Sequence, residues 1–128
     1  MNRPVLALFA LIMAQPAPAG ETPGFSADIV PILRSRCAVC HLTGEEAGNM
    51  SLVPDAAYEN LVGVKSPTTG LVRVEPGKPD ASYLIMKLEG TYLSKGGSGA
   101  RMPFGAEPLS ADNIKLIRDW IAAGASKN

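Results

Sequence analysis

The chain has 128 residues, and its 12 Lys and Arg residues balance its 12 Asp and Glu residues to give a formal net charge of zero. This balance disfavours nucleic-acid binding, which usually needs a concentrated basic face. The sequence also shows no basic amphipathic helix of the kind that binds a membrane surface. The aromatic fraction is 5%, which is low for a domain whose core consists of side chains alone. A buried prosthetic group would compensate for this deficit.

Residues 1–19 are expected to be a signal peptide that is removed on export. A basic start precedes the nine apolar residues 5–13, and Ala17-Pro18-Ala19 fits signal-peptidase cleavage before Gly20. The apolar run is far shorter than the roughly 20 residues that span a bilayer, which disfavours a retained membrane anchor. We therefore expect a soluble, exported protein, periplasmic or in a comparable compartment, with no stable membrane insertion.

The remaining 109 residues fit a single domain of the common size of about 100–150 residues. Residues 20–24 are expected to be a flexible leader rich in Gly and Pro, and residues 25–128 the domain. The pattern predicts a first helix from Ser26, as N-cap, to about Arg36, with Asp28 favouring the positive helix end. Its apolar face consists of Ile29, Ile32 and Leu33.

The middle of the chain predicts short elements. Residues 54–61 favour a short helix, and the β-prone residues 62–65 and 71–75 could pair as a small hairpin. A third helix is predicted from Asp80, as N-cap, to about Glu89.

Residues 95–101 contain three glycines and predict a mobile or tightly bent loop. The last helix has Ser110 as N-cap and Gly124 just beyond its end. Trp120 on this helix is expected to pack in the core against Ile29 or Leu33 of the first helix.

The CAVCH segment (residues 37–41) holds both cysteines and the single histidine of the chain. Cys-x-x-Cys-His is the attachment pattern of c-type haem. The thiols of Cys37 and Cys40, one helical turn apart, can reach two vinyl groups on the same edge of a porphyrin. His41 can then ligate the iron, with its second ring nitrogen donating to a backbone carbonyl.

Other uses of these residues are disfavoured. In a thioredoxin-like site the cysteine pair opens a helix, whereas here it follows one. A structural zinc site needs four ligands, and the chain has two Cys and one His. A disulfide across so small a loop would stabilise a domain little.

The single histidine excludes bis-histidine ligation within one molecule, which leaves methionine, lysine or an open position for the second ligand. Met86 lies in an apolar helical run and is expected in the core. Met50 follows His41 by only nine residues, so the chain between them would have to run extended around the ring and would leave little room for packing. Met102 follows the glycine-rich loop and precedes Pro103, which favours extended backbone. We expect Met102 to be the ligand. A thioether ligand raises the reduction potential and closes the iron to other molecules, which favours a carrier.

With the CAVCH segment and Arg101-Met102-Pro103, the chain resembles class I c-type cytochromes, and within them the planctomycete-type cytochrome c domain. The matching stretches are residues 28–33, 74–79, 82–84, 109–110 and 120–125. The resemblance implies an all-α fold whose first and last helices cross beside one haem, with His41 as proximal and Met102 as distal ligand. In that group the domain is often one module of a larger protein.

The expected function is that of a periplasmic single-electron carrier with one covalent haem c, and not of an enzyme. Its expected partners are a redox-protein donor and acceptor, which it meets as a monomer or as a subunit of a larger oxidoreductase. A haem-based ligand binder or sensor with a displaceable Met102 is the alternative, and a peroxidase is a third. Lys95 and Arg101 flank the ligand loop and are expected to be solvated rather than to contact haem propionates.

Overall fold

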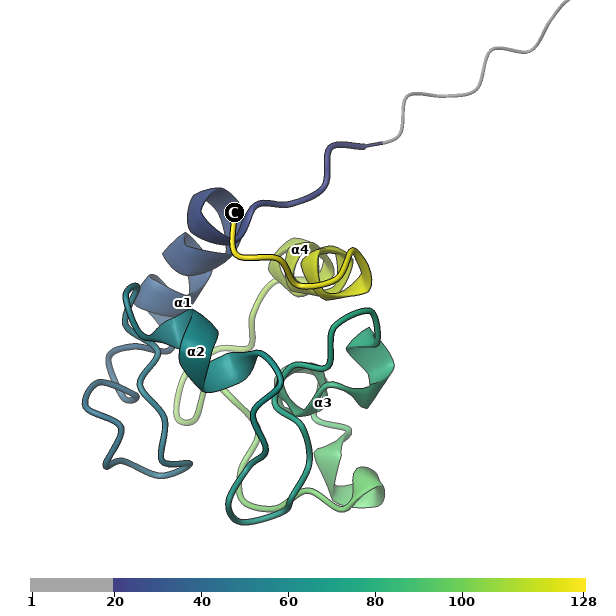
Figure 1. Cartoon of the computed structure of the whole chain (residues 1–128). Helices are drawn as coiled ribbons and strands as arrows, with labels where there is room; N and C mark the ends of the chain where they lie inside the picture. Colours follow the sequence, from purple (N-terminus) through teal and green to yellow (C-terminus); the bar gives the residue numbers. More distant parts are fainter. Residues whose placement is uncertain (1–19) are drawn as a thin grey trace, which may run out of the picture.

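The computed structural model describes residues 20–128, so the predicted signal peptide lies outside the described residues. Over this part the chain forms four α-helices joined by turns and loops, without a strand (Figure 1). The helices are α1 (Val30–Arg36), α2 (Ala57–Leu61), α3 (Tyr83–Glu89) and α4 (Ala111–Ala122). The domain is therefore mostly helical, as the sequence predicts.

The N-terminal helix starts differently from the prediction. Residues 20–24 have no regular structure, and a π-helical turn at Phe25–Ile29 leads directly into α1. Ser26 is not the N-cap, because Gly24 precedes the first turn. The N–H of Gly24 donates to Asp28 Oδ2 (2.7 Å), and the N–H of Phe25 donates to Asn128 Oδ1 (2.9 Å). These carboxylate and amide oxygens satisfy donors that a helix start leaves free.

The middle of the chain has less regular structure than predicted. Residues 54–56 form a turn, so α2 is shorter than the predicted helix. The predicted hairpin is reduced to two isolated bridges, Lys65 with Val72 and Val62 with Val74.

Helix α3 starts later than predicted, and Asp80 is not its N-cap. A 3-10 turn at Pro79–Ala81 precedes it, and Ser82 occupies the N-cap position with extended backbone. The carboxylate of Asp80 instead pairs with Arg118 of α4. Gly90 ends α3 in the left-handed conformation (φ 80°), in which glycine is unstrained.

Helix α4 confirms its predicted cap, because Ser110 Oγ accepts a hydrogen bond from the N–H of Asn113 (3.2 Å). Trp120 is 1% exposed, as expected for a core residue. Its ring neighbours are Phe25 and Tyr58, with centroids at 5.3 and 6.5 Å. Ile29 and Leu33 belong to the same buried cluster.

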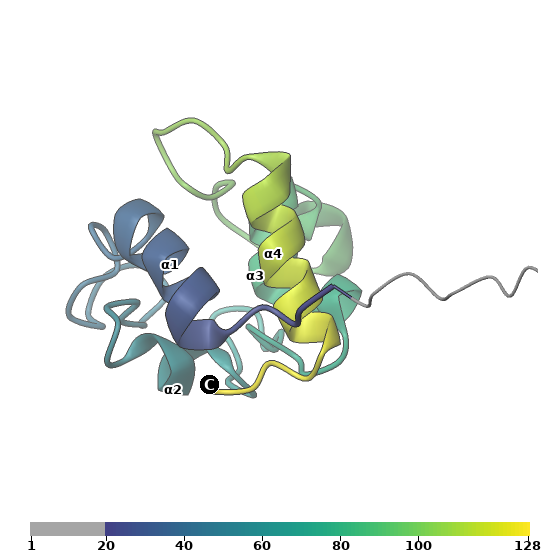
Figure 2. The same ribbon diagram turned by 90° about the horizontal axis from the view of Figure 1, so that it is seen from above.

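The two ends of the domain meet at this aromatic cluster. The turn at Phe25–Ile29 packs against α4, and α3 packs against another side of α4 (Figure 2). Within residues 20–128, no helix combines the length and the apolar character that crossing a membrane requires.

Candidate functional site

The CAVCH segment continues α1 as a hydrogen-bonded turn. The N–H of Cys37 donates to Leu33 O (2.9 Å), and the N–H groups of Cys40 and His41 both donate to Cys37 O (3.1 and 3.0 Å). The carbonyl of His41 then accepts from the N–H of Leu52 (2.8 Å). The turn leaves Cys37 half-buried, Cys40 exposed and His41 buried.

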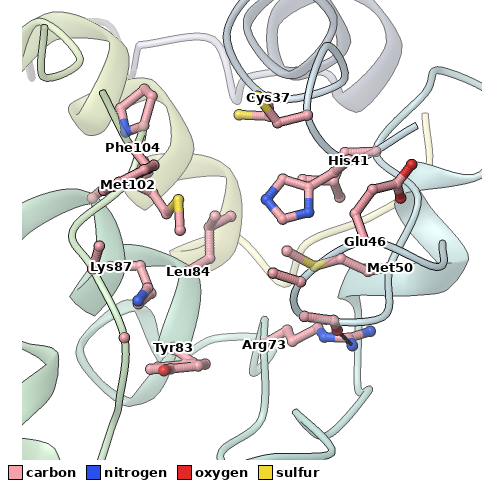
Figure 3. A pocket seen from close by; sticks show the side chains of 18 of the residues that line it. Cys37, His41, Glu46, Met50, Arg73, Tyr83, Leu84, Lys87, Met102 and Phe104 are labelled. Carbon is pink, nitrogen blue, oxygen red and sulfur yellow. Dashed lines mark hydrogen bonds between the residues drawn. The ribbon is translucent and has the colours of Figure 1, made fainter. Parts of the chain in front are cut away.

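A cavity of about 600 Å³ opens beside this turn, lined mainly by apolar atoms. Ligand pockets usually measure about 300–1,000 Å³, so this one is large enough for a sizeable ligand. All four residues predicted for the site line it, namely Cys37, Cys40, His41 and Met102. Figure 3 shows the imidazole of His41 and the side chain of Met102 pointing into the cavity from opposite sides.

Both thiols are free. Burial raises the pKa of Cys37 to about 11, against the opposing effect of the Arg36 guanidinium. Cys37 is therefore a neutral thiol at physiological pH, with the sulfur and the hydrogen that addition to a carbon–carbon double bond requires.

Burial also lowers the pKa of His41, with the Glu46 carboxylate opposing this effect and the Arg73 guanidinium adding to it. A neutral imidazole has a lone pair for a metal ion. The expected hydrogen bond from its second nitrogen is not formed, because Nδ1 is buried without a partner within the described residues. An unpaired buried polar atom costs about 1–3 kcal/mol. The backbone of His41 is held by two hydrogen bonds, from its N–H to Cys37 O and from the N–H of Leu52 to its carbonyl.

The segment that carries Met102 is tied to α3, so of the two predicted states the loop adopts the tightly bent one. The N–H of Met102 donates to Lys87 O (3.0 Å), and the Nζ of Lys87 donates to Ser98 O (2.8 Å). The hydroxyl of Tyr92 donates to Gly99 O (2.8 Å), and the Lys87 ammonium lies 4.1 Å from the centre of its ring. Lys95 is exposed, as predicted, and ends a 3-10 turn at Tyr92–Lys95.

Gly97 is required by this bent loop. A Cβ atom there would lie 2.7 Å from Tyr83 Cε2 and 2.8 Å from Tyr92 Cβ. Both distances are below 3.0 Å, closer than Cβ atoms approach other heavy atoms in proteins, so only glycine lets the loop pack on the two tyrosines.

The other methionines occupy different positions. Met86 is buried in the core, as predicted. Met50 lines the cavity, which its short separation from His41 did not lead us to expect. A Cβ on Gly48 would lie 3.7 Å from Met50 Cε and 3.8 Å from His41 Cε1, so both side chains are on one side of the cavity. Met102 is the methionine that faces His41 from the other side.

Besides Met50, sequence reasoning missed Arg73, a buried residue that lines the cavity. An arginine in a β-prone segment has no motif around it that would mark this position.

Within residues 20–128, no three His, Cys, Asp or Glu side chains gather as a potential metal site. Comparisons of the chain with known protein families, with curated proteins and with solved structures find no match.

Proposed function

We propose that this protein is a monohaem c-type cytochrome that carries single electrons outside the cytoplasm, with a class I cytochrome c fold. The observation that carries the proposal is the convergence of four side chains on one cavity. Cys37, Cys40 and His41 line it from the turn after α1, and Met102 lines it from the far side. The apolar lining suits a porphyrin, which exposes a large apolar surface.

Cys37 and Cys40 are the residues that would attach the haem. Each S–H would add across one vinyl C=C bond, with sulfur bonding to one carbon and hydrogen to the other. No group leaves and no oxidant is needed, so neutral thiols suffice. The half-buried Cys37 and the exposed Cys40 belong to one turn, so both sulfurs can serve one porphyrin edge.

His41 and Met102 are the residues that would ligate the iron. The neutral imidazole and the thioether are good iron ligands, and together they favour a high reduction potential. When bound, haem supplies an iron centre that takes up and returns single electrons. His41 and Met102, by closing both faces of that centre, would exclude other molecules, and this favours a carrier over a ligand binder. The carrier would exchange electrons with redox proteins, alone or as a subunit of a larger oxidoreductase.

The absorption spectrum of the purified holoprotein tests this proposal. We expect a haem that resists acid–acetone extraction, a weak red charge-transfer band of iron–methionine bonding in the oxidised form, and little binding of carbon monoxide in the reduced form. Met102→Ala should lose the band and bind carbon monoxide.

Met50→Ala is the matched control, because Met50 lines the same cavity beside His41. It should keep the band and remain closed to carbon monoxide. Rapid binding by the wild type, unchanged in Met102→Ala, would instead support a haem-based ligand binder or sensor. Absence of haem would exclude both functions.

A further inference from the structure

The end of α3 is capped by the segment that carries Met102. The last four carbonyls of a helix have no partner within the helix. In α3 the carbonyl of Lys87 accepts from the N–H of Met102, and the carbonyl of Leu88 accepts from Nε of Arg101, both at 3.0 Å. Two consecutive residues of the segment therefore bind two consecutive carbonyls of the helix.

The side chain of Arg101 also packs against the backbone at the end of α3. A Cβ atom on Gly90, which follows the helix, would lie 3.2 Å from Cδ and 3.4 Å from Nε of Arg101. The Arg101 side chain therefore lies in the space that a larger residue at position 90 would occupy. A cation near the C-terminal end of a helix is favourable, because the free carbonyls there carry partial negative charge. Arg101 is exposed, as the sequence predicts, but its Nε is held by the helix.

These contacts bear on the direction of the Met102 side chain. A single hydrogen bond, from the N–H of Met102 to Lys87 O, would let the segment pivot about that bond. The second bond, from Arg101 to the next carbonyl of the helix, opposes this rotation. In Figure 3 Met102 and Lys87 lie on the same side of the cavity, facing His41.

We propose that Arg101 is a positioning residue for Met102, and that the hydrogen bond from its Nε to Leu88 O keeps the thioether directed at the iron. This inference rests on the proposed function. It assigns the effect to the N–H at Nε and not to the charge of the guanidinium.

Glutamine and lysine separate these two properties of the Arg101 side chain. In glutamine the amide nitrogen follows Cδ, as Nε does in arginine, so Arg101→Gln keeps an N–H donor there and loses the charge. Arg101→Lys keeps the charge and has a methylene group at that position.

Carbon monoxide binding and the iron–methionine band of the holoprotein are the measurements. Arg101→Lys should weaken the band in the oxidised form. In the reduced form it should bind carbon monoxide about tenfold more tightly than wild type, since a hydrogen bond from a charged donor is worth about this factor. Arg101→Gln should remain close to wild type in both measurements.

Arg118→Gln is the control for a general loosening of α3. The guanidinium of Arg118 pairs with Asp80 and with Glu89, the last residue of α3, and it comes from α4. This variant should lower the thermal stability of the holoprotein and leave its affinity for carbon monoxide unchanged.

Gly90→Ala tests the same contact without changing Arg101, so it decides if Arg101→Lys fails to fold. The added methyl group would crowd the Arg101 side chain and should also tighten carbon monoxide binding. Gly96→Ala is its control, because the backbone is equally left-handed (φ 85° against 80°) and a Cβ there meets nothing within 4 Å.

Wild-type affinity for carbon monoxide in both Arg101→Lys and Gly90→Ala would overturn the inference and leave the proposed function standing. An effect in Arg101→Gln but not in Arg101→Lys would also overturn it, because the charge would then be the active property. Equal effects of Arg101→Lys and Arg118→Gln would overturn it as well, since they would show only a loosened helix. A wild-type protein without haem, or without the iron–methionine band, would overturn the proposed function together with this inference.

Discussion

The backbone N–H of Met102 donates to the carbonyl of Lys87 at 3.0 Å, which joins the loop after residue 96 to the last turns of α3. The side chain of Lys87 holds the same loop through Ser98 O at 2.8 Å. One residue of α3 therefore contacts the loop at two points. The position of the Met102 thioether therefore depends on how firmly α3, including Tyr83, and Tyr92 of the following 3-10 turn hold this loop.

Removal of the Tyr92 hydroxyl should loosen the Met102 loop. Tyr92→Phe deletes the hydrogen bond to Gly99 O and should cost about 0.5–1.5 kcal/mol of stability. In the holoprotein it should also increase carbon monoxide binding to the reduced form. Tyr58→Phe is a matched control, because the Tyr58 hydroxyl donates to Ala125 O (2.9 Å) away from the cavity. Both variants should lose similar stability in thermal unfolding. Only Tyr92→Phe should increase carbon monoxide binding, and an equal increase in both variants would contradict the positioning role of Tyr92.

Gly97→Ala should displace the loop itself. The added methyl group would meet Tyr83 and Tyr92 at distances below 3 Å, and such overpacking costs about 1–3 kcal/mol. We expect a weaker iron–methionine band in the oxidised holoprotein. Gly96→Ala is the comparison, since a Cβ there meets nothing within 4 Å and its positive φ of 85° adds only backbone strain. If Gly97→Ala kept the full band, the close packing on the tyrosines would not position Met102.

Much of the fold could be predicted from local sequence signals. The sequence predictions were wrong where residues far apart in the chain determine the start of a helix. Ser110 and Gly90 act on their own helices, so they could be recognised from neighbouring residues. The start at Phe25 depends on Asn128, which is 103 residues away, and Asp80 pairs with Arg118, which is 38 residues away. These partners meet only after folding.

The site divides in the same way. The CAVCH segment is a local pattern, and Met102 could be chosen because one histidine and few methionines leave little choice. Arg73 could not be predicted, because its burial depends on the carbonyls of residues 48, 49 and 60 surrounding it.

The ionisation of Glu46 should make the stability of the protein vary with pH in the acid range. Its carboxylate accepts from the N–H groups of Thr43 and Gly44, both at 3.0 Å, and these bonds, led by that of Thr43, lower its pKa from 4.5 to about 2. A depressed pKa gives stability that is present above pH 4.5 and is lost as the pH falls toward 2. Glu46→Gln should therefore show a shallower loss of thermal stability between pH 4.5 and 2 than wild type.

Glu45→Gln is the control for this measurement, because Glu45 is the adjacent exposed carboxylate of the same turn. It should retain the wild-type pH dependence. Identical slopes for Glu46→Gln and wild type would show that the turn gains nothing from the charged form.

Asn128 should stabilise the start of the first helix. Asn128→Ala removes the oxygen that accepts from the N–H of Phe25, and loss of such a cap costs about 1 kcal/mol. Lys127→Ala removes an exposed ion pair with Glu59, which is worth about 0–1 kcal/mol. Denaturant unfolding should rank Asn128→Ala as the more destabilised variant, and the reverse order would contradict a capping role for Asn128.

The central claim is that Cys37 and Cys40 carry a covalent haem. The most direct measurement is the intact mass of the protein after expression with a c-type maturation system and acid–acetone extraction. We predict the mass of the polypeptide plus one haem, and the mass of the polypeptide alone for Cys37→Ala/Cys40→Ala. A wild-type protein with the mass of the bare polypeptide under the same conditions would contradict the claim.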